Sequence, residues 1–516
     1  MEEDYKLGFL KSGSIGEGFI IRIGENISLE NLRIGDFIVI EGRIYKFFGI
    51  VDDLKILSGS DEIFFDPPQT DIERLAVKGN IVFSEAQISP YIMVDGFGNV
   101  HSIKTMPEHF SIARKAQEED LDLIFKSQAR VPFHVGSPLT MSEKIHIDLE
   151  KLSVRNNGIF GITGSGKTVL AKIVFSGMIK KDIASLLIFD MHNEYGRFSK
   201  GEGAITPALK TFFPKKVKVF DVSPKNKDAD EIIRIPLKYI EPEDLSLISS
   251  ALYYSEKSGE TAFIVAKKKG KDWLKYLFSL QEKSEEEISQ ESQLVGVSAA
   301  SLSALARHTS QLRRLAFLED VEEESSIDSI LSYLRNGTSV VVQFSQEYAN
   351  NPLAYFLVSN VISRRIHKRY ENLTEDERKR RIVIVIEEAH KFLSTDLREG
   401  NIFGIIAREM RKFNVTLFII DQRPSGIDPE VLSQVGTRFT LQLLDDSDID
   451  AVFQGVGGGV RLKKILRSIE PKQALLFGYA LPMPVAMKVR EFNEEFFKEI
   501  TESKKDPLKG IDEIYG

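Results

Sequence analysis

Cysteine is absent from all 516 residues of the chain. Its absence excludes a disulfide-stabilised scaffold, a zinc site built on cysteine and an iron–sulfur cluster. A chain that uses no disulfides suits a reducing compartment, so we expect a cytoplasmic protein.

Long hydrophobic runs and an excess of positive charge are missing as well. No uninterrupted apolar stretch approaches the ~20 residues of a membrane-spanning helix, and the acidic start "MEEDYKLGFL" lacks the apolar core of a signal peptide. We therefore expect no membrane attachment. The formal net charge of −8 argues against a protein that coats nucleic acid, but not against one that presents a few basic loops inside a channel.

The order of strand-like and helix-like segments predicts a multidomain α/β protein. Short β-rich segments such as "GFIIRI" and "DFIVIEG" predict a small barrel or sandwich at the N-terminus. Apolar strands then alternate with helices, which indicates a parallel-rich sheet, and a run of long helices interrupts that pattern. The predicted boundaries are a barrel over 1–110, a helical connector over 111–131, an α/β core over 132–238 and 336–495, an inserted helical bundle over 239–335, and a C-terminal tail over 496–516.

The segment "GITGSGKT", Gly161 to Thr168, matches the phosphate-binding pattern G-x-x-x-x-G-K-[ST]. It lies between an apolar strand and a helix predicted from Val169 to about Lys180, which disfavours an accidental match in a glycine-rich turn. Lys167 is expected to reach the β- and γ-phosphates of ATP, and Thr168 to ligate Mg²⁺. The residues predicted to contact the nucleotide here are Gly161, Thr163, Gly164, Ser165, Gly166, Lys167, Thr168 and Val169.

A second apolar strand, "IVIVIEEAH", ends in two acids. We predict that Glu387 holds Mg²⁺ through a water, and that Glu388 polarises the attacking water. The alternative is that both acids merely cap a buried strand.

A third strand end, "LLIFDMHNEYG", carries four polar side chains. Because ligands bind at the carboxyl ends of parallel strands, Asp190 and Glu194 are expected beside the γ-phosphate, orienting water or holding the outer shell of Mg²⁺. His192 and Tyr195 would support them or stack on the base. A zinc site with one histidine and two acids is the rival interpretation.

Further residues complete a set for phosphoryl transfer. Gln422, in "LFIIDQRPSG", can sense the γ-phosphate. Arg408 and Arg411 lie three apart, on one face of a helix, and either can act as an arginine finger for a neighbouring subunit. Arg155 is another candidate, and solvated basic faces are the alternative for all three arginines.

Taken together, these segments resemble the HerA family of DNA translocases, relatives of the FtsK DNA pumps. The matching pieces are "GITGSGKT", "IFDMHNEY", "IEEAHKFL", "IAREMRKF" and "DQRPSGIDPEVLSQ", in the family's order. The resemblance covers nearly the whole chain and implies a RecA-like P-loop ATPase core, a HAS-like N-terminal barrel and the inserted bundle. Glu387 departs from the family's commoner Asp.

By this resemblance we expect a homohexamer that uses ATP and Mg²⁺ to thread double-stranded DNA through its channel, with a NurA-like nuclease or another effector enzyme docked on the barrel. Two alternatives stay open: a ring-shaped scaffold for an effector in anti-phage defence, and a motor of the secretion or conjugation type. Candidates for DNA contact are Lys391, Arg398 and the run "SRRIHKRY", with solvated faces as the alternative.

Overall fold

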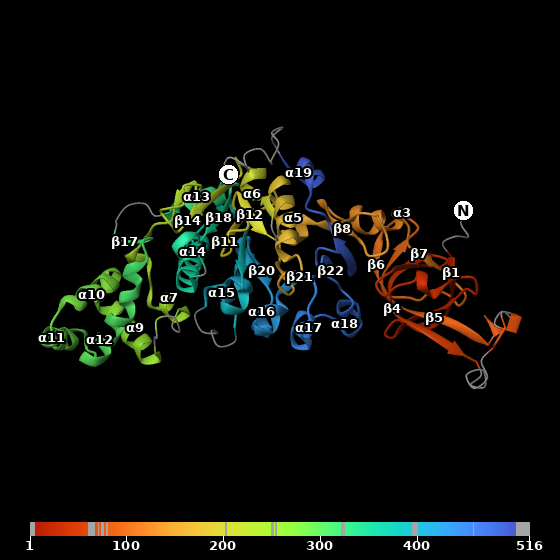
Figure 1. Cartoon of the computed structure of the whole chain (residues 1–516), viewed down its shortest axis with the longest axis horizontal. Coiled ribbons are helices and arrows are strands. Elements are labelled where there is room, and N and C mark those ends of the chain that lie inside the picture. The colour runs from red at the N-terminus through yellow and green to blue at the C-terminus, as the bar shows by residue number, and fades with distance from the viewer. Residues whose placement is uncertain are drawn as a thin grey trace. The chain divides into compact units, whose positions relative to one another are not determined.

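The computed structural model describes residues 6–501 except 60–67, 71, 74–76, 79–80, 202–203, 249–251, 253–254, 321–325, 350, 395–400 and 458. The chain forms two compact units. The first contains residues 1–152, 158–170 and 436–491, and the second contains 153–157, 171–435 and 492–516. Figure 1 gives the order and labels of the elements. Arg398 and most of the C-terminal tail lie outside the described residues.

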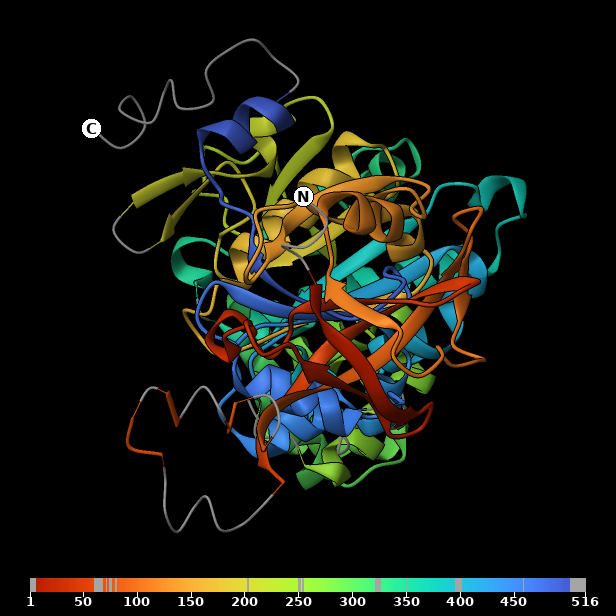
Figure 2. The same cartoon turned by 90° about the vertical axis from the view of Figure 1, so that its right-hand side faces the viewer.

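The first unit begins with a closed six-stranded barrel. Strand β2 pairs with β1 on one side and with β5 on the other, so the ring closes in the order β2-β1-β7-β3-β4-β5. Buried apolar side chains such as Phe19, Ile38 and Phe47 fill it, and its red and orange strands face the viewer in Figure 2. The strands are β1 (Lys6–Ser14), β2 (Gly18–Ile23), β3 (Phe37–Glu41), β4 (Tyr45–Ser58), β5 (Val82–Asp95) and β7 (Ile112–Lys115), with β6 (Val100–Ser102) added at the edge of β5.

The first unit also contains five antiparallel strands, with two short helices between β21 and β22. A basic helix, α18 (Gly459–Arg467), is bonded to the barrel. Arg461 donates to the carbonyl of Gly16 at 2.7 Å and to Ser89 Oγ at 3.2 Å. The strands follow the order β21 (Val435–Thr440), β22 (Gln473–Gly478), β23 (Val485–Val489), β8 (Pro132–Pro138) and β9 (Ile145–Asp148), and the second helix is α17 (Asp446–Val452).

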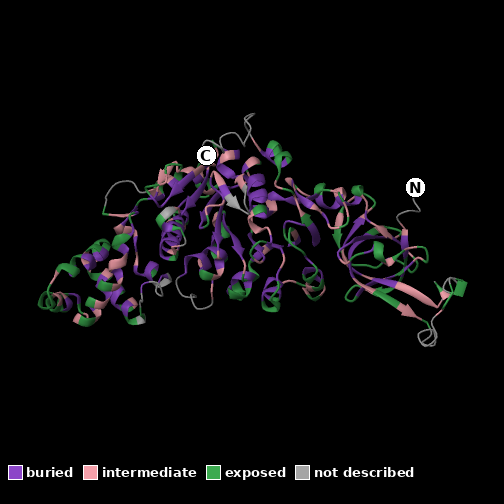
Figure 3. Cartoon of the chain, viewed as in Figure 1, coloured by how far each residue is buried: buried purple, intermediate pink, exposed green. Residues whose placement is uncertain are grey.

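The second unit is built on a parallel sheet, as predicted. All six residues of β19, "IVIVIE", are buried, because a parallel strand covered by helices on both faces needs apolar side chains on both sides. Such strands are purple in Figure 3. The order is β15 (Glu231–Ile232), β14 (Val217–Asp221), β18 (Ser339–Gln343), β11 (Ser185–Asp190), β19 (Ile382–Glu387) and β20 (Val415–Asp421).

The predicted helical insertion is present and is tied to the core by a buried ion pair. Arg364, on α14 (Pro352–Glu371), donates from Nε and Nη2 to the two carboxylate oxygens of Asp244, at 3.1 and 2.6 Å. Asp244 is fully buried. The run "SRRIHKRY" therefore supplies part of an internal joint, and neither prediction for it, DNA contact or a solvated face, holds for Arg364. The insertion helices are α7 (Pro242–Leu247), α9 (Glu256–Lys269), α10 (Trp273–Ser279), α11 (Glu285–Val295) and α12 (Ala299–Thr309).

Three segments differ from the sequence predictions. The connector, expected to be helical, starts with β7, which completes the barrel, and only α3 (Glu118–Leu121) and a π-helical turn follow it. Helix α13 (Ser326–Arg335), assigned to the bundle, lies against β18 and β11. Helix α19 (Glu494–Ile500), partly assigned to the tail, buries two phenylalanines and an isoleucine.

Candidate functional site

The phosphate-loop residues belong to the first unit, between β10 (Asn156–Phe160) and α5 (Lys167–Lys180). Gly164 and Gly166 have φ angles of 78° and 105°, which residues with a Cβ adopt only at a cost. At Gly161 an added Cβ would lie 2.9 Å from Leu441 Cβ. These glycines let the backbone curl so that successive N–H groups can surround an anion.

Lys167 is held by its own loop. Its Nζ donates to the carbonyl of Gly161 at 2.8 Å and to that of Ile162 at 2.9 Å. Ser165 Oγ also donates to the Ile162 carbonyl, at 2.7 Å. The loop therefore has its predicted shape and keeps a cationic group beside the cradle, which fits the binding of phosphate.

The stretch "DMHNEYG" forms a tight turn at the end of β11, in the second unit. The Asp190 carboxylate accepts bonds from the backbone N–H of Glu194 at 2.7 Å and of Tyr195 at 2.9 Å, and from Gln343 Nε2 at 3.0 Å. Burial nevertheless raises the pKa of Asp190 to about 6. Asp190 thus shapes the turn itself, which explains why an acid ends this buried strand.

His192 and Tyr195, the two residues predicted to support the site, differ in burial. His192 is exposed, whereas Tyr195 is fully buried. Stacking of Tyr195 on a base, as the sequence suggested, is therefore wrong. Within the described part of the chain no group of three or more His, Asp or Glu side chains is arranged to hold a metal ion, so the zinc interpretation gains no support.

Glu387 ends β19 and is 5% exposed. The backbone N–H of Met191 donates to its Oε2 at 3.2 Å. Burial first, and then the neighbouring Asp190 and Glu194, raises the pKa of Glu387 well above its usual range. A nearby cation would stabilise the charged form of this carboxyl and lower its pKa.

A buried lysine that sequence reasoning missed faces these acids. Lys172, on α5, is 3% exposed and donates to Ser199 Oγ at 2.5 Å. Burial lowers its pKa, and the charges of Glu194, Asp190 and Glu387 oppose that shift. A charged residue within the apolar run "VLAKIVF" was the available signal for a buried lysine.

Glu388, the predicted base, has a φ angle of 50°, in the left-handed region. Gln422 Nε2 donates to both of its carboxylate oxygens, at 3.0 and 3.2 Å. The structure thus brings these two predicted residues together. Beside them, His390 Nδ1 lies 3.0 Å from Oδ1 of the buried Asp421, a pair that the sequence analysis did not single out.

The three candidate finger arginines are all exposed. Arg408 lies in the last turn of α15 (Ile402–Glu409), and its Nη1 is 3.9 Å from Glu430 Oε2. Arg411 follows in a separate 3-10 turn, so the single helical face that we predicted for the two is interrupted. Arg155 precedes β10. Because all three side chains lie at the surface, each stays a candidate for contact with another subunit.

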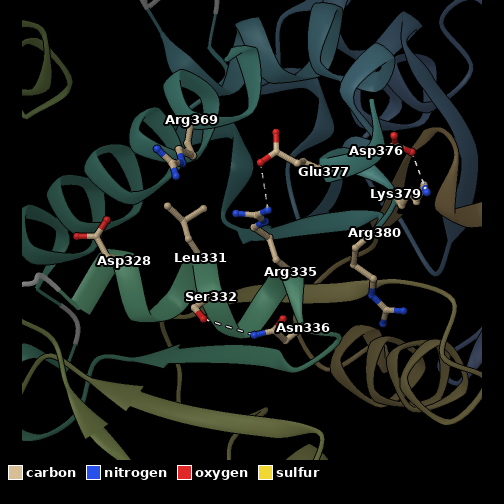
Figure 4. A pocket seen from close by; sticks show the side chains of 10 residues that line it. All are labelled: Asp328, Leu331, Ser332, Arg335, Asn336, Arg369, Asp376, Glu377, Lys379 and Arg380. Carbon is tan, nitrogen blue, oxygen red and sulfur yellow. Dashed lines mark hydrogen bonds and ion pairs between the residues drawn. The ribbon is translucent and has the colours of Figure 1, made fainter. Parts of the chain in front are cut away.

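The second unit also has a polar groove of about 890 Å³, shown in Figure 4. Arg335 and Glu377 face each other across it at 3.9 Å. It lies near the amino ends of β18 and β19, whereas Asp190 and Glu387 stand at carboxyl ends. None of the predicted nucleotide residues lines it, so this groove is separate from the site that the sequence predicts for the nucleotide. Its lining residues are Asp328, Leu331, Ser332, Arg335, Asn336, Arg369, Asp376, Glu377, Lys379 and Arg380.

Comparison with known proteins supports the resemblance seen in the motifs. Residues 133–366 match the family model described as the central domain of the helicase HerA. A DNA double-strand break repair helicase HerA of Saccharolobus solfataricus is 24% identical over 476 residues, covering 89% of this chain and 88% of that protein. Its counterpart in Sulfolobus acidocaldarius is 26% identical over 483 residues and 90% of each chain.

The structure is also similar to that of VirB4 of Thermoanaerobacter pseudethanolicus. The TM-score is 0.47 at 13% sequence identity, over 72% of this chain and 99% of that one. No helix in the described part of the chain is long and apolar enough to cross a membrane.

Proposed function

We propose that the chain is a member of the HerA family and an ATP-driven motor that moves along double-stranded DNA as a homohexameric ring. In this proposal it serves DNA end resection and recombinational repair together with a nuclease. The observation that carries it is the formed phosphate loop, with Lys167 bonded to the Gly161 and Ile162 carbonyls. The relatives named DNA double-strand break repair helicases supply the choice of DNA as the substrate.

ATP fits the residues of the phosphate loop. Lys167 exchanges its two carbonyl partners for phosphate oxygens, and the glycine-rich backbone supplies N–H donors at the start of α5. Mg²⁺ would neutralise phosphate charge, and it usually takes one or two carboxylates and leaves its other positions to phosphates and water. Thr168 and, through a water, Glu387 would hold it, and the charge of the ion would offset the burial and the neighbouring acids that raise the pKa of Glu387.

Glu388 acts as the general base in this proposal. Its carboxylate must turn an oxygen toward the attacking water, and Gln422 now donates to both oxygens. A shift of Gln422 would therefore accompany activation, which suits a residue that senses the γ-phosphate. Glu194, half-buried beside Asp190, is the second choice for the base.

Measurement of ATP hydrolysis with and without duplex DNA tests the proposal. We expect duplex DNA to stimulate turnover, and we expect Lys167→Ala to abolish hydrolysis and leave the fold and the ring intact. A ring with density in its channel in electron micrographs would support the threaded assembly. An ATP hydrolysis rate that is the same with and without DNA would contradict the proposed motor function. It would favour a scaffold that uses ATP as a switch.

The partner surface in this proposal is on the barrel. Phe9, Phe110 and Ile112 are 39%, 76% and 43% exposed, and Phe9 pairs with Ile112 across β1 and β7. Phe110 has a φ angle of 65°, a conformation that costs a bulky residue roughly 1–3 kcal/mol. An apolar patch kept at the surface at that cost suits a docking site for a nuclease or another effector enzyme.

Reversal of charged residues on the barrel would test this docking surface less well than a change at Phe110, because some of these residues are buried. Asp52, on β4, is an example: it is 3% exposed and accepts a bond from Ser89 Oγ. We expect Phe110→Asn to weaken co-purification of the nuclease partner while the ring and basal ATPase survive. Phe97→Asn, at a side chain 94% exposed elsewhere on the barrel, is the matched control. Equal effects of the two changes would exclude a specific patch.

A further inference from the structure

The outward face of α9, in the helical insertion, combines apolar and cationic side chains. Phe263 and Ile264 are 47% and 40% exposed. Lys267 and Lys268 are exposed one turn further on, and Lys271 is exposed in the 3-10 turn Gly270–Asp272 that follows the end of the helix. A spacing of three to four residues puts the apolar pair and Lys267 and Lys268 on one side of the helix.

The opposite side of α9 packs against the rest of the helical bundle. Thr261, Ala262 and Val265 are buried there, in the interior of the bundle. Lys269 also points to that side, where its Nζ lies 3.8 Å from Glu291 Oε2 and 3.9 Å from the ring centre of Tyr276. The bundle therefore needs neither the exposed apolar pair nor the exposed lysines for its core.

The exposed lysines also differ from Lys269 in their partners. Among the residues that the structure describes, Lys267, Lys268 and Lys271 form no ion pair. Three other acids of the insertion, Glu285, Glu286 and Glu287, lie in the first turn of α11. The acids nearest these lysines in the sequence are Glu260, one turn earlier on α9, and Asp272, next to Lys271. Lysines in the last turn of a helix also favour its dipole, but that effect gives no reason for an exposed phenylalanine beside them.

The geometry points to a binding site for single-stranded DNA on this face. We propose that Phe263 stacks on a base while Lys267, Lys268 and Lys271 contact successive phosphates. Proteins that hold single strands combine lysines along the backbone with aromatic rings on which bases stack.

Two other ligands fit this face less well. A duplex would engage the lysines through its phosphates but would offer no exposed base to Phe263. A membrane surface requires a broad apolar face, whereas α9 exposes only Phe263 and Ile264, with Glu260 on the same side. The single strand that arises when a motor opens or processes a DNA end uses both parts of the face.

This inference rests on the proposed DNA motor, and its test separates the two. Binding of the full-length protein to fluorescent oligothymidylate and to a duplex of equal length is measured by anisotropy. We expect Phe263→Leu to weaken single-strand binding by about fivefold or more, because the loss of one stacked base is worth ~1–3 kcal/mol. Phe263→Trp should restore it, and Ile264→Ala, which removes no ring, should change it little.

The proposed lysine contacts predict a second measurable effect, on the salt dependence of DNA binding. Replacement of Lys267, Lys268 and Lys271 by Gln should reduce the slope of log affinity against log salt by about 2 for single strands. A control with the same charge change replaces three exposed lysines outside the insertion, Lys55, Lys104 and Lys215. We expect that control to keep the slope of the unaltered protein.

Several results would overturn the inference. They are single-strand affinity unchanged in Phe263→Leu, equal losses for Leu and Trp at this position, and altered ring assembly in place of altered DNA binding. Binding of the unaltered protein to anionic vesicles that the lysine changes abolish, with DNA binding intact, would assign the face to a membrane. If the unaltered protein binds DNA and the α9 variants bind it equally well, this inference fails and the proposed motor stands. If it binds no DNA, the proposed motor fails as well.

Discussion

Replacement of Glu388 by Gln should stop hydrolysis and leave ATP binding intact. The change keeps the size and the left-handed backbone of the residue and removes its basicity. General-base catalysis contributes about 10²–10⁴ in rate, so we expect turnover to fall by at least ~10²-fold, or about 2.7 kcal/mol in the activation barrier.

The same change should hardly affect the fold. Gln422 now donates to both oxygens of Glu388, at 3.0 and 3.2 Å. The amide of the variant keeps one acceptor, so about one hydrogen bond is lost, worth ~0.5–1.5 kcal/mol. That loss is small against the ~5–15 kcal/mol of stability typical of a folded domain.

The assay has two parts. Phosphate release reports turnover, and the binding of a fluorescent ATP analogue reports affinity. Glu375→Gln, at an exposed glutamate outside the predicted site, controls for the loss of one negative charge. Turnover of the Glu388 variant within a few-fold of the unaltered protein would refute the assignment. A large loss in Glu194→Gln instead would move the base to Glu194.

Three more predictions follow from the described contacts. If Arg408 acts across a subunit interface, Arg408→Ala should be inactive, and mixed rings with Lys167→Ala subunits should regain some ATPase activity, as phosphate release would show; full activity of Arg408→Ala alone would exclude the role. Asp244→Leu removes the two bonds from Arg364 to Asp244 and leaves the guanidinium with Glu241 and the Tyr239 carbonyl, so it should cost ~1.5–3 kcal/mol, seen as a lower urea midpoint; an unchanged midpoint would contradict that joint. The hydrogen bond to Asp421 raises the pKa of His390 above its usual 6.5. Its contribution to stability is therefore complete below pH 6.5 and is lost as pH rises through the folded-state pKa. His390→Asn should flatten this dependence in urea unfolding at several pH values, and an identical pH dependence in both proteins would refute it.

Local sequence pattern was sufficient for the elements of the α/β core. Strands such as "IVIVIE" are apolar throughout, and the phosphate loop has glycines at the positions that need them, so both could be identified without a structure. The order of motifs was sufficient to predict the similarity to HerA proteins that the comparisons found. The roles of the acids were harder, because a carboxylate at a strand end looks the same whether it binds a ligand or its own backbone.

Tertiary structure decided which charged residues are internal and which are available. Asp190 is occupied by two backbone N–H groups and Gln343, Arg364 is buried against Asp244, and Asp52 lies under Ser89. Partners in these contacts are up to 153 residues apart along the chain, so no local spacing could reveal them. Burial without such a partner costs a charge far more than exposure does, and only the folded chain determines which residues meet that condition.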